Sequence, residues 1–149
     1  MKYNYLTIEQ ALKTHSMTIL VSGGGVDGIL ESGKLESILK HIQNDQYYPT
    51  FEEKLTHLVF CSNKFHCFQD GNKRIAISLG AQFLLINGYV FLVKKFIQEM
   101  ENISYYLAAG KISKELLLKI ITSLIYEIDF SEELKLAIFK SISDEGNWL

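Results

Sequence analysis

Apolar side chains recur every three or four residues along most of the chain, which is the spacing of one face of an α-helix. Thr7 and Thr50 are each followed three positions later by Gln or Glu, a pattern typical of helix starts. Ser32, Ser113 and Ser131 stand at the start of further periodic stretches. The pattern predicts helices over about 7–20, 32–42, 50–66, 72–86, 94–109 and 113–128, and a last one from 131. Residues 89–93 are expected to form a short strand or a buried extended link.

The apolar faces of these helices are expected to form one core. Their residues are Ile8, Ala11, Leu12 and Ile19; Leu35, Ile38 and Leu39; Phe51, Leu55, Leu58, Val59, Ser62 and Phe65; Ile75, Leu79, Phe83, Leu84 and Ile86; Leu116, Leu117, Ile120, Ile121, Leu124 and Ile128; and Leu134, Ala137, Ile138 and Ile142. Ala76, Gly80 and Ala81 are small and predict a close approach between helices. We therefore expect a single all-α domain over residues 1–149, around a central buried helix that begins after Gly71.

Composition agrees with this prediction and excludes several classes of protein. The chain has 149 residues, 48% of them hydrophobic, and a single proline, which favours a helical globular domain. A net charge of −2 gives no general attraction to nucleic acid or to an anionic membrane. Two cysteines argue against a disulfide framework. With no apolar signal core at the start and no long apolar run, we expect a cytoplasmic protein.

Most of the side chains that could bind a ligand or take part in a reaction lie between two predicted helices, at residues 66–74. These residues are His66, Cys67, Phe68, Gln69, Asp70, Gly71, Asn72, Lys73 and Arg74. The backbone N–H groups at the start of a helix bind anions, and Gly71 allows a phosphate to approach the backbone closely. Lys73 and Arg74 oppose the helix dipole there, which is a more favourable arrangement when an anionic ligand is bound. The segment therefore predicts a phosphate site.

Two further side chains of the segment suit phosphate transfer. Asp70 can bind a hard cation such as Mg²⁺, and His66 can accept the proton of an attacking hydroxyl group. Taken singly, each residue has a simpler explanation, because a histidine at a helix end is usually structural and Asp-Gly-Asn is an ordinary turn. Phe68 is expected to anchor the segment in the core under either interpretation. The joint spacing, rather than any one residue, favours catalysis.

These residues resemble the motif of the Fic/Doc (Fido) family, His-x-Phe-x-(Asp/Glu)-(Gly/Ala)-Asn-(Gly/Lys)-Arg. Lys73 in the penultimate position makes the chain look most similar to the Doc, or death-on-curing, branch. Further similarity at 23–37, 48–54 and 83–88 extends the resemblance over about residues 20–90. The resemblance implies a compact helical bundle, often with a β-hairpin flap beside the active site, which would fall near residues 43–48.

The resemblance also implies an activity. Most studied Fic proteins transfer AMP from ATP to a hydroxyl group of a target protein, whereas Doc-type proteins act as kinases and transfer the γ-phosphate. By resemblance, ATP and Mg²⁺ are the cofactors, His66 is the general base and Asp70 holds Mg²⁺. The phosphates are assigned to Gly71, Asn72, Lys73 and Arg74. The expected partners are a target protein, such as the translation factor elongation factor Tu, and a small antitoxin, neither of which the sequence identifies.

Two features bear on which group is transferred. AMP-transferring members usually carry a second arginine three residues after the first, and Ile77 occupies that position here. An aliphatic side chain cannot replace a charge-assisted contact with phosphate, so the kinase is favoured. Ser141 and Glu145, however, fit the pattern (Ser/Thr)-x-x-x-Glu-(Gly/Asn), which resembles the inhibitory motif of AMP-transferring Fic proteins. A plain helix end with Gly146 as its cap explains the same residues.

Other interpretations stay open. A degenerate domain of this family that only binds a partner or a nucleotide is an alternative to an enzyme, although binding alone needs no base at His66. His57, Cys61, His66 and Cys67 suggest a zinc site, since His57 and Cys61 share a helix face. Residues 23–28 match the dinucleotide-binding pattern G-x-G-x-x-G and 28–34 approach a P-loop. Both are discounted, because the first follows a predicted helix and the second lacks its hydroxyl residue.

Overall fold

The computed structural model describes residues 2–21, 32–64 and 72–143, of which 18–21, 32 and 72 are described by their backbone alone. These residues form α1 (Ile8–Val21), α2 (Ser32–His41), α3 (Phe51–Lys64), α4 (Asn72–Ile86), the 3₁₀ helix η1 (Val90–Leu92), α5 (Val93–Ala108), α6 (Lys114–Tyr126) and α7 (Glu132–Ile142). No strand occurs within this part of the chain, so the prediction of an all-α fold is confirmed.

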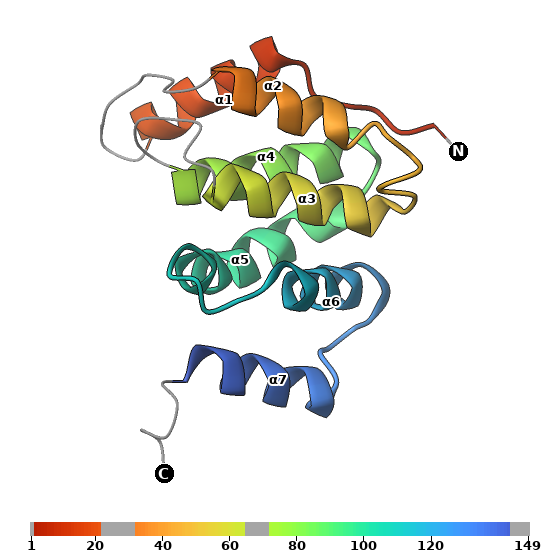
Figure 1. Ribbon diagram of the computed structural model, residues 1–149, viewed down its shortest axis with the longest axis vertical. Helices are drawn as coiled ribbons and strands as arrows, with labels where there is room; N and C mark the ends of the chain where they lie inside the picture. Colours follow the sequence, from red (N-terminus) through yellow and green to blue (C-terminus); the bar gives the residue numbers. More distant parts are fainter. Residues whose placement is uncertain (1, 22–31, 65–71, 144–149) are drawn as a thin grey trace.

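The helices lie in successive tiers (Figure 1). From top to bottom in that view, α1 and α2 come first, followed by α3 and α4, then α5 and α6, and finally α7. Helices α3 and α4 pack against each other, against α1 and α2 above, and against α5 and α6 below, whereas α7 packs on α6. The tier of α3 and α4 therefore forms the centre of the fold and lies between the other parts of the core.

Hydroxyl side chains cap the helices where the sequence predicts it. At α1 the cap is reciprocal, because the Thr7 oxygen accepts from the Gln10 N–H (3.1 Å) while the Gln10 amide oxygen accepts from the Thr7 N–H (2.9 Å). At α3 the Thr50 oxygen accepts from the Glu53 N–H (3.2 Å). Ser113 and Ser131 cap α6 and α7 in the same way, each accepting a backbone N–H at 3.1 Å. These local signals explain why the predicted helix starts are correct.

Helix α3 is buried on almost every side, and its buried positions include a charged residue. The Lys54 side chain has no exposed surface, and its ammonium group donates to the Ile42 carbonyl oxygen (2.8 Å) and to the Asp45 carboxylate (2.7 Å). Burial acts to lower the pKa of Lys54, but the bonds to Asp45 and Tyr5 outweigh it and the pKa lies above its usual value. Lys54 thus joins the end of α2 and the following turn to α3.

Gly80 allows α4 to lie close to its neighbours. A Cβ atom at this position would lie 2.7 Å from Phe96 Cζ on α5 and 2.9 Å from Val59 Cγ2 on α3, closer than real side chains approach. Ala76, one turn earlier, is completely buried. The close helix approach that the small residues predicted is therefore confirmed, and α4 is central as expected.

The end of α4 is tied to the N-terminal segment. Gly88 adopts a positive φ of 90°, and the Tyr89 N–H donates to the Leu84 carbonyl oxygen (3.0 Å), which closes the helix with a Schellman turn. The Asn87 side chain then bonds twice to the backbone of Asn4, because its amide oxygen accepts the Asn4 N–H (2.8 Å) and its amide nitrogen donates to the Asn4 carbonyl oxygen (2.9 Å). This pair, the Asn4–Asn87 clasp, holds residues 83 positions apart in contact.

The predicted flap is absent at residues 43–48. These residues form turns instead, because the Asn44 side chain accepts the Gln46 N–H (2.9 Å) and the Asn44 carbonyl accepts the Tyr48 N–H (2.9 Å). Such side-chain bonds give the backbone an alternative to strand pairing. The prediction that a hairpin falls near 43–48 is therefore wrong.

Two smaller predictions are also wrong. Residues 89–93 form neither a strand nor a buried link, since Val90–Leu92 is a 3₁₀ helix in which Val90 and Phe91 are exposed. Ile128 does not belong to the core and is 86% exposed. Helix α6 ends at Tyr126, and the extended conformation of Glu127 carries the chain away from the helix before Ile128 is reached.

Candidate active site

The two helices that flank the motif are in place. Helix α3 ends at Lys64 and α4 begins at Asn72, as the sequence predicts. Most of the candidate residues, namely His66, Phe68, Asp70 and Gly71, lie outside the described residues. Asn72 is the first residue of α4, and the side chains of Lys73 and Arg74 are exposed in its first turn. The described part of the site is therefore the N-terminal end of α4.

The charges at this helix end suit an anion. The first turn of α4 contains no acidic residue, although acidic residues are the ones that a helix dipole stabilises there. Among the described residues, no carboxylate forms an ion pair with Lys73 or Arg74. Two exposed cations beside free backbone N–H groups fit the phosphates of a nucleotide.

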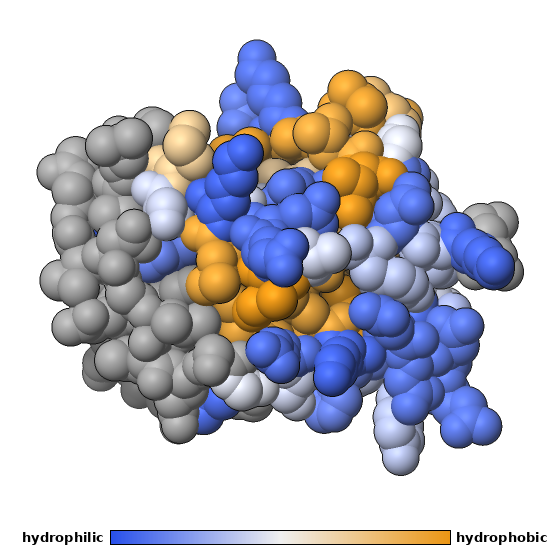
Figure 2. Space-filling view, turned by 90° about the horizontal axis from the view of Figure 1, so that it is seen from above, coloured by the Kyte–Doolittle hydropathy of each residue, from blue (hydrophilic) through white to orange (hydrophobic). Residues whose placement is uncertain are grey.

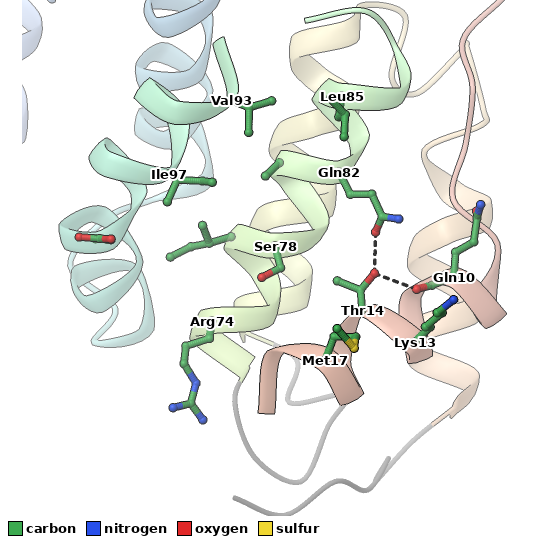
Figure 3. Close-up of a pocket in the computed structure, with 13 residues that line it drawn as sticks. Gln10, Lys13, Thr14, Met17, Arg74, Ser78, Gln82, Leu85, Val93 and Ile97 are labelled. Carbon is green, nitrogen blue, oxygen red and sulfur yellow. Dashed lines mark hydrogen bonds between the residues drawn. The ribbon is translucent and has the colours of Figure 1, made fainter. Parts of the chain in front are cut away.

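A groove that sequence reasoning missed begins at Arg74. It has a volume of about 1020 Å³ and lies between α1, α4 and α5. Figure 3 shows Arg74 at one end of it and Leu85 at the other, with Ser78 and Gln82 between them on the same face of α4. Ile77, at the position of the missing second arginine, also lines the groove. The spacing of these residues, three or four apart, places them on one face of α4, but it does not indicate which helices form the walls of the groove.

The walls of the groove are mostly apolar, with a few polar groups. Met17 on α1 and Ile97 on α5 contribute exposed apolar surface. The Thr14 hydroxyl donates to the Gln10 carbonyl oxygen (2.9 Å) and lies 2.6 Å from the Gln82 amide oxygen, which joins α1 to α4 at the base of one wall (Figure 3). Figure 2 views the molecule from above, the side on which α1 and α2 lie in Figure 1, and shows apolar side chains near the centre of this face with hydrophilic ones around them. The face that carries α1 and α2 is thus not uniformly polar.

The end of α3 that leads to the motif is attached to α5. The Asn63 amide donates to the Ser104 carbonyl oxygen and the Lys64 ammonium donates to the Leu107 carbonyl oxygen, both at 3.2 Å. Leu107 lies near the C-terminal end of α5, the negative end of the helix dipole, where a cation is favourable. These bonds fix the last turn of α3, two residues before His66.

The proposed zinc residues only partly come together. Cys61 Sγ lies 3.6 Å from His57 Nδ1, whereas His66 and Cys67 lie outside the described residues. The Lys114 ammonium is 2.8 Å from His57 Nδ1 and donates to it. Burial, with contributions from Lys114 and His41, lowers the pKa of His57 from 6.5 to about 4. Within the described ranges no three potential ligands form a metal-binding group, and an ammonium group occupies one nitrogen of the best candidate.

The inhibitory pattern at the C-terminus is only half described. Ser141 lies in α7, where its hydroxyl donates to the Lys111 carbonyl oxygen, and Glu145 lies outside the described residues. Helix α7 is separated from α4 by the tier of α5 and α6 (Figure 1). The role of Glu145 stays a prediction.

Comparison with protein families identifies a match. The family model described as Fic/DOC family matches residues 5–84, a stretch that begins before α1 and ends within α4. No curated protein matches the chain. None of the helices in the described ranges combines the length and the apolar character needed to cross a membrane.

Proposed function

Because the chain belongs to the Fic/DOC family, we propose that it is an ATP-dependent transferase that modifies a hydroxyl group of a target protein, and that the group it transfers is the γ-phosphate. The observation that carries this proposal is the segment 66–74, which retains the base, the carboxylate and the cations, together with Ile77 in place of a second arginine. This combination favours the Doc branch of the family.

Each residue of the segment would have a separate role in the transfer of the γ-phosphate. His66 accepts the proton of the target hydroxyl as its oxygen attacks the γ-phosphorus. The new oxygen–phosphorus bond forms while the bond from the γ-phosphorus to the bridging oxygen breaks, and ADP leaves. Lys73 and Arg74 offset the negative charge of the phosphates, and Asn72 contributes the start of the helix. Such positioning and charge stabilisation supply most of the catalysis in phosphoryl transfer.

Asp70 would hold Mg²⁺, which when bound neutralises phosphate charge and orients the phosphates. The first turn of α4 has two cations and no acidic residue and so suits the phosphates, which leaves Asp70, the one carboxylate of segment 66–74, for the metal. Phe68 would anchor the segment against the core.

Ile77 supports phosphate transfer over AMP transfer. It follows Arg74 by one turn on the face of α4 that lines the groove, where its neighbours Ala81 and Ile97 are also apolar. A second phosphate-binding arginine would have to act from this position, and none of these side chains can form a charge-assisted hydrogen bond.

The test is incubation of the protein with a target protein and with ATP labelled at either the α- or the γ-phosphate. We expect label on the target from the γ-position only. His66→Ala should abolish the labelling, while His41→Ala, which removes an exposed histidine at the end of α2, should not. Label from the α-position alone would overturn the kinase assignment, and equal activity of His66→Ala would overturn the role of the base.

AMP transfer by an autoinhibited protein is the second candidate, and the Ser141–Glu145 pattern is the observation that favours it. If Glu145 blocks the site, Glu145→Gly should raise AMP transfer at least about tenfold, as losing an ion pair to Arg74 or Lys73 would predict. Glu133→Gly is the matched control, because Glu133 is exposed in the first turn of α7. Unchanged activity in Glu145→Gly would exclude this regulation.

We further propose that the protein acts in the cytoplasm on a translation factor, and that a small antitoxin holds it silent. Cytoplasmic ATP and a Cys61 side chain that forms no disulfide are compatible with this location. Purification of the protein from its native cells should recover a small partner protein at a one-to-one ratio. A fully folded protein that binds ATP but labels no target, with or without such a partner, would instead indicate a degenerate binding module.

A further inference from the structure

A second, smaller pocket lies away from the motif, between α3 and α6. Its volume is about 200 Å³, below the range of sites for drug-sized ligands. The turn that replaces the predicted flap closes one side of it through Tyr47 and Tyr48. Nothing in the proposed transferase activity uses this pocket, so its occupant can be considered independently.

A buried hydroxyl group in the pocket lacks a partner. Thr56 lines the pocket and is 2% exposed, and its Oγ1 forms no hydrogen bond within the described part of the chain. A threonine within a helix commonly bonds to the carbonyl oxygen four residues earlier, and Thr14 and Thr122 both do so, at 2.9 and 2.7 Å. Leaving a buried hydroxyl unpaired is unfavourable, and a ligand in the pocket would remove that cost.

An ammonium group belongs to the same pocket. Lys114 lines the pocket, donates one N–H to His57 Nδ1 at 2.8 Å, and lies 5.2 Å from the centre of the Tyr48 ring. A lysine ammonium has three N–H donors, so two remain. Lys114 is also the first residue of α6, the positive end of a 13-residue helix. This side of the pocket suits a carboxylate.

Two other side chains of the pocket have the opposite charge. Glu53 and Glu115 both line it, and only one oxygen of Glu53 is engaged, by the Thr50 hydroxyl at 2.8 Å. Two carboxylates within reach of one pocket favour a cationic group on the ligand. Leu118 and the rings of Tyr47 and Tyr48 supply the apolar surface.

We propose that this pocket binds a free amino acid with an apolar side chain. Its carboxylate accepts from Lys114 and from the Thr56 hydroxyl, its ammonium group lies against Glu53 and Glu115, and its side chain packs on Leu118 and the tyrosine rings. A single amino acid is also the size of ligand that the pocket volume admits. A simple anion would satisfy Lys114 and Thr56 but would leave both glutamates without a counter-charge.

The experiment measures the affinity of the full chain for each of the twenty amino acids by isothermal titration calorimetry. For the tightest-binding amino acid, the same titration is repeated with the analogue that lacks the amine and with the primary amide that lacks the carboxylate. We expect both analogues to bind at least about tenfold more weakly, since each loses a charged hydrogen-bonding group. No binding by any amino acid up to about 10 mM, or undiminished binding of either analogue, would overturn the proposal.

Substitutions in the pocket test whether the amino acid binds there. Thr56→Val keeps the shape of the side chain and removes the hydroxyl, and should weaken binding by about tenfold. Thr122→Val is the matched control, because it removes a hydroxyl that bonds to its own helix, and it should leave binding unchanged. Glu115→Gln, at an exposed position, should weaken binding of the amino acid but not of the analogue without an amine. Equal affinities of Thr56→Val and the original protein would overturn the site.

Discussion

Helices α3 and α7 both begin at a hydroxyl residue that accepts a backbone N–H, yet they occupy opposite environments. Helix α3 packs against α2, α4, α5 and α6, and even its lysine at position 54 is buried. Helix α7 packs mainly on α6, and Leu134 is the one residue of this helix that is buried. Similar local sequence signals thus produce one helix that the whole fold depends on and one that lies at its edge. The family match covers α3 and does not reach α7.

The largest difference between the two helices should appear when a leucine is shortened. Leu58→Ala on α3 removes a completely buried side chain and should lower the free energy of unfolding by about 2–5 kcal/mol. Leu136→Ala on α7 removes a side chain that is 54% exposed and should cost less than about 0.5 kcal/mol. Urea denaturation of both variants measures the difference. Similar losses would show that α7 is as well packed as α3.

A lysine on each helix gives the next comparison. Lys54→Ala leaves the Ile42 carbonyl oxygen without its donor and opens space in the core, so we expect a loss of about 2–3 kcal/mol. Lys135, whose ammonium is 3.3 Å from Glu132 on the surface of α7, should contribute at most about 0.5 kcal/mol. Thermal unfolding of Lys54→Ala and Lys135→Ala checks both values, and an unchanged melting temperature for Lys54→Ala would contradict the role of this contact.

Because His57 is buried on α3, the free energy of unfolding should depend on pH. Its pKa is lowered from 6.5 to about 4 by burial, by Lys114 and by His41, so the unfolded chain takes up a proton before the folded one does. Stability is therefore retained above pH 6.5 and falls on acidification towards pH 4, by roughly 2 kcal/mol. In His57→Gln this decrease should be smaller between pH 6.5 and 4, as followed by urea denaturation. An identical slope in the two proteins would rule out a neutral buried imidazole.

The smallest effect should come from the caps. Thr50→Ala and Ser131→Ala each remove one capping hydrogen bond, worth about 1 kcal/mol. We expect Thr50→Ala to lower the stability of the whole domain, and Ser131→Ala to lower only the protection of α7 amides against hydrogen exchange. If Ser131→Ala shifts the global unfolding transition as much as Thr50→Ala does, α7 unfolds together with the rest of the molecule.

The predictions that hold are those that depend on neighbours in sequence. Helix periods, the caps at Thr7 and Ser131, and the stop at Gly88 all arise within a few residues. The hairpin expected at residues 43–48 followed from the family resemblance, and turns form there because Asn44 bonds to the Gln46 N–H and Lys54 holds Asp45 and Ile42. A contact of that kind leaves no periodic signal in the sequence.

The features of the candidate site also differ in whether the sequence can reveal them. The motif at 66–74 and the departure at Ile77 are visible in the sequence because the chemistry requires particular residues at fixed spacing. The groove that starts at Arg74 requires α1 and α5 to stand on either side of α4, and the pocket at Thr56 requires α6 to lie beside α3. Both depend on how helices far apart in sequence pack together, so only the structure reveals them.

The Asn4–Asn87 clasp has a consequence for the order in which the chain acquires its structure. The hydrogen bonds close a loop of more than eighty residues, which contains the whole stretch that matches the family. Such a closure costs conformational entropy before it returns any contact energy, so it should follow the packing of α3 and α4 and not initiate it. On a ribosome, Asn4 is synthesised well before Asn87, and these hydrogen bonds cannot form until Asn87 has left the exit tunnel. The segment around Asn4 is therefore made early and should be among the last to take up its native position.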